Sequence, residues 1–67
     1  MFSTKGVLEN ALKDLETAKK LLEEAKKVVQ VSKAGGGDVS KQEAEINLYQ
    51  YRYDTTKASI EKMLKAL

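Results

Sequence analysis

Apolar side chains in the first half of the chain recur every seven residues, the repeat of an amphipathic helix that packs against another helix. A large residue takes one position of the repeat, and an alanine follows three residues later. These positions are Leu8, Leu15, Leu22 and Val29, with Ala11, Ala18 and Ala25. Ser3 or Thr4 can cap the helix by accepting from its free backbone N–H groups. The pattern predicts a helix over residues 4–33 whose alanines allow close approach of a partner helix.

A second seven-residue repeat predicts a helix over residues 39–66. One position of this repeat holds Val39, Ile46, Tyr53, Ile60 and Leu67, and the position three residues later holds Gln42, Tyr49, Thr56 and Met63. The helix has two possible starts. Asp38 can cap it directly, or Ser40 and Glu43 can form a capping box with a hydrophobic staple from Val39 to Ala44.

Three consecutive glycines at residues 35–37 separate the two repeats. Each glycine costs about 1 kcal/mol of helix propensity relative to alanine, so we expect a break over residues 34–38. Gly35 is expected to end the first helix in the left-handed conformation. A short link brings the second helix back antiparallel. The predicted fold class is therefore all-α, with residues 1–67 forming a single coiled-coil-like antiparallel hairpin. Because two helices alone cannot enclose a core, we expect it to oligomerise.

The repeats also predict which side chains pack between the helices and which remain free for a partner. We expect the intra-hairpin seam to consist of Leu8, Ala11, Leu15, Ala18, Leu22, Ala25, Val29, Ile46, Tyr49, Tyr53, Ile60 and Met63. A helix directs Tyr49 and Tyr53 to one side and Tyr51 to nearly the opposite side, so the three tyrosines cannot all face the first helix. Tyrosine is favoured at interfaces. The predicted partner interface is Leu48, Tyr51, Leu64 and Leu67.

The composition argues against chemistry and favours association. The chain contains no Cys and no His, and its acids are interspersed with lysines, so we expect no catalytic, cofactor-binding or metal-binding residues. A net charge of +2 is too balanced for a nucleic-acid binder. No stretch is long and apolar enough for a signal peptide or a membrane span. We therefore expect a protein made in the cytoplasm without a cleaved signal and without membrane insertion.

The second helix resembles the C-terminal helices of bacterial axial export structures. Flagellar rod and hook proteins carry a spacing that is matched here by Asp38-Val39, Ile46, Gln50, Tyr53 and Ile60. Type III secretion needle subunits are similar in overall form, as short helical hairpins around a small-residue turn. Their C-terminal pattern is matched by Tyr49, Ile60, Lys62, Met63 and Leu64, although this chain lacks the proline usual in their turn.

The resemblance implies a subunit that polymerises helically around a channel and leaves the cell by a route that needs no signal peptide. The leading hypothesis is thus a self-assembling structural subunit whose partner is another copy of itself. Two alternatives remain open from the sequence. One is a closed dimeric four-helix bundle that serves as a binding or regulatory module. The other is a secretion chaperone or adaptor completed by a partner protein's helix.

Overall fold

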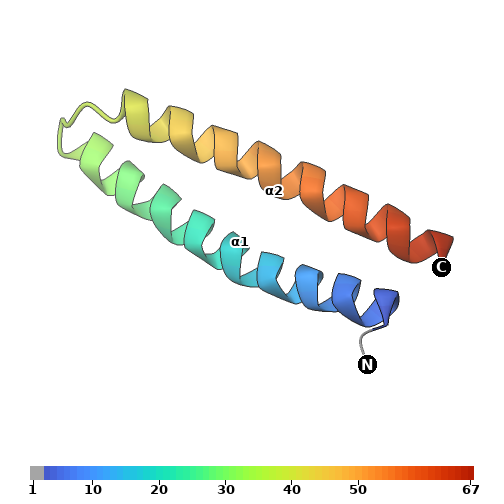
Figure 1. Ribbon diagram of the computed structural model, residues 1–67. Helices are drawn as coiled ribbons and strands as arrows, with labels where there is room; N and C mark the ends of the chain where they lie inside the picture. The colour runs from blue at the N-terminus through green and yellow to red at the C-terminus, as the bar shows by residue number, and fades with distance from the viewer. Residues whose placement is uncertain (1–2) are drawn as a thin grey trace.

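The protein is a helical hairpin, seen here in a computed structural model that describes residues 3–67. Helix α1 spans Thr4–Ala34 and helix α2 spans Ser40–Ala66. The helices lie side by side and antiparallel, with the start of α1 and the end of α2 at one end and the connecting loop at the other (Figure 1). The molecule measures 52 × 17 × 14 Å. The predicted all-α hairpin is confirmed.

Of the two residues predicted to cap helix α1, Ser3 and Thr4, the structure uses Ser3. The Ser3 hydroxyl oxygen accepts a hydrogen bond from the Gly6 backbone N–H at 3.0 Å. The Ser3 carbonyl accepts from the Val7 N–H at 3.0 Å, which starts the helical ladder. Ser3 therefore satisfies one of the donors that every helix N-terminus leaves free. From this start α1 continues one residue beyond its predicted end.

Glycine ends α1, but not at the position the sequence suggested. Gly35 has an ordinary φ of −79°, and Gly36 takes the left-handed conformation with a φ of 88°. The Gly36 N–H donates to the Lys33 carbonyl, and the Gly37 N–H donates to the Ser32 carbonyl, each at 3.0 Å. These two bonds form a Schellman motif, which satisfies carbonyls that the helix end would otherwise leave free. The prediction of a left-handed Gly35 is therefore wrong by one residue, because α1 continues through Ala34.

Asp38 organises the start of α2. Its carboxylate Oδ1 accepts from the Ser40 N–H at 3.1 Å and from the Ser40 hydroxyl at 2.8 Å. Both bonds favour the charged carboxylate, so they lower the pKa of Asp38 below its ordinary value of 3.8, the backbone bond most strongly. Neither predicted start is realised, because Val39 is the N-cap residue of α2 and no side chain caps the helix. Asp38 instead fixes the turn that leads into α2 through its two bonds to Ser40.

The core of the hairpin is thin. Among the described residues only Val39, Tyr53 and Ile60 are buried, with 7%, 9% and 6% of their surface exposed. They share one position of the α2 repeat. The α1 residues that face them are half-buried: Leu8, Ala11, Leu12, Leu15, Ala18, Leu22, Ala25 and Val29. A single seam between two helices cannot cover its own flanks, so most of the apolar surface stays accessible to a partner.

Candidate protein–protein interface

The orientation of α2 differs from the one expected. Tyr49 and Met63 were predicted in the seam, but 54% and 48% of their surfaces are exposed. Residues one position further along the chain occupy the seam instead. These are Glu43, Gln50 and Leu64, which are half-buried. Leu64, which was predicted in the partner interface, therefore lies in the seam.

Two polar contacts between the helices accompany this orientation. The Lys26 ammonium donates to the Gln50 side-chain oxygen at 2.8 Å, and the Gln50 side-chain nitrogen donates to Asp54 at 3.1 Å. Lys33 lies 3.5 Å from Glu43. These contacts lie on one edge of the hairpin and hold Glu43 and Gln50 beside α1. Tyr49, on the other side of the α2 seam, is consequently directed to the opposite edge.

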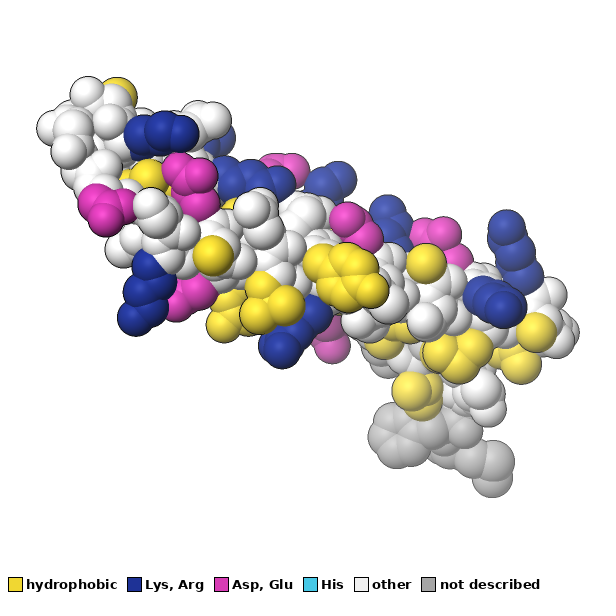
Figure 2. Space-filling view, turned by 90° about the horizontal axis from the view of Figure 1, so that it is seen from above, with side chains coloured by type: hydrophobic (Ala, Val, Ile, Leu, Met, Phe, Trp, Pro, Cys, Tyr) yellow, Lys and Arg dark blue, Asp and Glu magenta, His cyan; other side chains and the backbone are white. Residues whose placement is uncertain are grey.

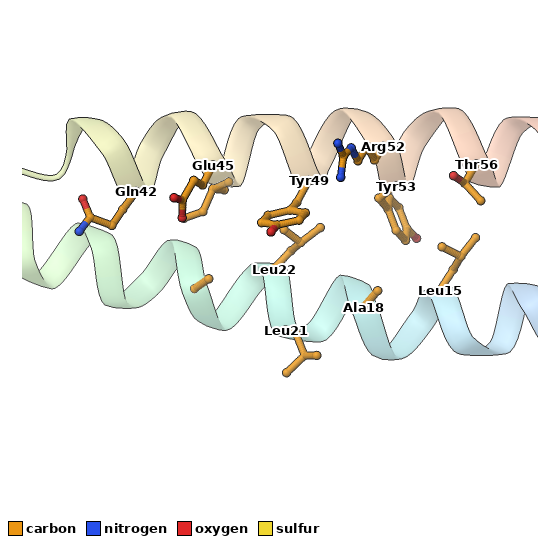
Figure 3. Close-up of a pocket in the computed structure, with 12 residues that line it drawn as sticks. Leu15, Ala18, Leu21, Leu22, Gln42, Glu45, Tyr49, Arg52, Tyr53 and Thr56 are labelled. Atoms are coloured by element: carbon orange, nitrogen blue, oxygen red, sulfur yellow. The ribbon is translucent and has the colours of Figure 1, made fainter.

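That opposite edge carries an open groove between the helices, with a volume of about 550 Å³. Figure 3 shows Tyr49 and Tyr53 pointing from α2 toward α1, with Tyr49 above Leu22 and Thr56 above Leu15. The walls are mostly apolar. They consist of Leu15, Ala18, Leu21, Leu22, Ala25, Gln42, Glu45, Ile46, Tyr49, Arg52, Tyr53 and Thr56. We call this surface the groove face.

Two opposite charges border the groove face on α2. Glu45 and Arg52 both line it, and both are exposed. Neither forms an ion pair within residues 3–67, where the bridges are Lys33–Glu43 and Lys57–Glu61. A mostly apolar groove with a few charges at its border is typical of a protein interface. Neither residue was predicted from the sequence, although the two lie seven positions apart, one on each side of Tyr49.

A second apolar surface lies on the outer side of α2. Tyr51 is 69% exposed, and Leu48 is also exposed. Because successive helical residues turn by about 100°, Tyr51 points away from the side of α2 that carries Tyr49. Figure 2, which views the molecule from above, shows hydrophobic side chains at the surface among charged ones. Leu67, the remaining residue of the predicted partner interface, is exposed at the end of the chain.

The α1 side chains predicted for the seam lie on the half-buried side of that helix, and Leu15, Ala18, Leu22 and Ala25 also line the groove. Ile46 is half-buried beside them. Leu21 and Val28 are also exposed on α1, and neither was predicted to take part in an interface. Each directly precedes a large residue of the seven-residue repeat, Leu22 or Val29, which was their only signal in the sequence.

The described residues also bear on chemistry and on membranes. In the part of the chain that the structure describes, no three acidic side chains come together in a way that could hold a metal ion. Neither described helix has an apolar stretch long enough to cross a membrane. Comparison with protein-family models, with curated proteins and with solved structures found no match to this chain. The groove face and the outer side of α2 are therefore the features from which a function has to be argued.

Proposed function

We propose that this hairpin is a structural subunit that assembles with copies of itself. The observation that carries the proposal is that more of its large apolar side chains are exposed than buried. Within residues 3–67 three hydrophobic side chains are buried, whereas nine large ones are exposed. Small proteins of this length rarely obtain enough stability from their own core, and oligomerisation is one of the usual remedies.

Two separate apolar surfaces support an assembly larger than a closed pair. The groove face lies between the helices, and Leu48 and Tyr51 lie on the outer side of α2. A subunit with two distinct contact surfaces can join neighbours on both sides and extend into a ring or a fibre. As the specific assembly we propose a helical polymer of the secretion-needle or flagellar axial kind. Since the comparisons identify no such family, this choice rests on the residue spacing in α2 alone.

The proposal is tested by light-scattering mass across a roughly hundredfold concentration range, with electron micrographs of the same samples, since association depends on concentration. We expect the mass to grow and filaments or rings to appear. Tyr51→Ser should stop this growth while circular dichroism shows an unchanged helix content, because Tyr51 is exposed and supports no hairpin contact on the seam. A protein that stays monomeric over the whole range contradicts the proposal.

A closed dimer is the second candidate, and the groove face favours it. Pairing of two groove faces would cover Tyr49 and the open side of the seam and complete a four-helix bundle. Such a bundle would suit a binding or regulatory module. It predicts a constant dimer mass at every concentration above dissociation, no filaments, and no effect of Tyr51→Ser on that mass.

A further inference from the structure

The two charges at the groove face lie on either side of Tyr49. Glu45 comes four residues before Tyr49, and Arg52 comes three residues after it. All three line the same groove, and Glu45 and Arg52 lack an ion-pair partner within residues 3–67. The point midway between Glu45 and Arg52 lies only half a residue from Tyr49. When the same surface is turned by 180° about that midpoint, the acid of one copy meets the base of the other.

The same centre exists on α1. Figure 3 shows Leu22 below Tyr49 and Ala18 below Arg52. Ala18 comes four residues before Leu22, and Ala25 comes three residues after it. Both alanines line the groove, so a close neighbour would meet only methyl groups at these positions. Tyr49 and Leu22 thus mark the same level along the hairpin. At this level each helix has one groove residue four positions before the central residue and one three positions after it.

We propose that the groove face binds a second copy of this chain through a two-fold axis at that level. The axis is perpendicular to the helices, so each helix lies antiparallel to its equivalent and the two loops are at opposite ends. Glu45 then faces the partner's Arg52, and Arg52 faces the partner's Glu45. Ala18 likewise faces the partner's Ala25. This inference rests on the proposed function, because it names the geometry of one of its contacts.

The size of the surface agrees with a stable dimer. A standard interface buries roughly 800 Å² on each partner. The hairpin is 52 Å long and 17 Å wide, and its accessible surface is 5608 Å², so one long face suffices. A two-fold axis parallel to the helices would instead lay α2 over the partner's α1. The α1 wall of the groove is entirely apolar, so Glu45 and Arg52 would then find no opposite charge in the groove.

Charge reversal tests the geometry. In Glu45→Arg both cross-pairs become repulsive, and the same holds for Arg52→Glu. We expect each variant to weaken dimerisation by about tenfold, the size expected when two exposed ion pairs become two repulsive pairs. Since both residues are exposed and unpaired in the hairpin, the helix content measured by circular dichroism should not change. Glu24→Arg is the matched control, because Glu24 is an exposed acid that does not line the groove.

Mixing the two variants gives the decisive result. A dimer of one Glu45→Arg chain and one Arg52→Glu chain contains two attractive pairs. Native mass spectrometry should therefore detect more of the mixed dimer than random exchange produces, and the mixture should regain the wild-type dissociation constant within about threefold.

Two results overturn the inference, and they are distinguishable. If wild-type protein associates but each reversal acts like Glu24→Arg and mixing restores nothing, the two-fold pairing is wrong while self-assembly stands. If the wild type is monomeric at every concentration, the proposed function fails together with the pairing.

Discussion

Gly36 is the residue that determines how the chain turns back on itself. Its φ of 88° lies where side chains other than glycine are strained, whereas the φ of Gly35 is −79°. A Cβ on Gly35 would meet only ordinary contacts at 3.5 and 3.6 Å. The three glycines are alike in the sequence, but they have different roles in the loop.

We therefore expect Gly36→Ala to destabilise the hairpin by about 1–2 kcal/mol, the cost of a left-handed conformation for an ordinary residue. Gly35→Ala should be neutral or stabilise by up to about 1 kcal/mol, because it restricts the unfolded chain without strain. Urea denaturation followed by circular dichroism, at one protein concentration, measures both. Equal effects of the two substitutions would contradict the turn described here.

Asp38 makes the stability of the loop depend on pH. Ser40 lowers its pKa in the folded state through a backbone and a side-chain hydrogen bond. A lowered folded-state pKa means that the stabilisation is present in full above the pKa of the unfolded chain. It is lost as the pH falls through the lower folded value.

We expect the stability difference between wild type and Asp38→Asn to be largest near neutral pH and to shrink on acidification to about pH 2. Asparagine keeps an oxygen acceptor but cannot be protonated in this range. All other carboxyl groups are common to both proteins, so their effects cancel in the difference. Urea titrations at a series of pH values give the measurement, and a difference that grows on acidification would have the wrong sign.

At the scale of the helices, sequence and structure agree on α1 and differ on the facing of α2. In α1 large residues and alanines keep a strict repeat, and only one side of the helix can be the seam. In α2 either of two positions of the seven-residue repeat could face α1 together with Tyr53. One position holds Tyr49 and Met63, and the other holds Gln50 and Leu64. Apolar periodicity favoured the first.

In the structure the second position is the half-buried one, and Gln50 there contacts a residue far away in the chain. Gln50 is 24 residues from Lys26, and this hydrogen bond has no local signature. The glycines and heptads therefore sufficed to predict the hairpin and its ends to within one residue. The groove face could not be predicted, because it depends on the rotation of α2 about its own axis. Its α1 wall, which includes Ala18 and Ala25, and the α2 residues Ile46, Tyr49 and Tyr53 were predicted to lie between the helices, but not that the space between them would stay open.

At the scale of the whole molecule, different apolar side chains stabilise the hairpin and remain exposed for association. Ile60 is 6% exposed and belongs to the hairpin seam, whereas Met63 is 48% exposed. Met63 comes seven residues after Thr56, which lines the groove, so a regular helix places both on the same side. Ile60 and Met63 are thus neighbours on α2, but Ile60 packs within the hairpin and Met63 is available for a contact between copies.

Truncating each of them should separate the two contacts. Ile60→Ala removes buried contacts and should cost about 2–4 kcal/mol of hairpin stability, a large share of what a small domain has. Its melting temperature should fall at every protein concentration. Met63→Ala should leave the melt of dilute protein nearly unchanged but reduce the rise of melting temperature with concentration, because that rise reports association. Thermal melts at several concentrations, followed by circular dichroism, distinguish the effects. If Met63→Ala destabilised the dilute protein as much as Ile60→Ala, α2 would face α1 with the side that the sequence first suggested.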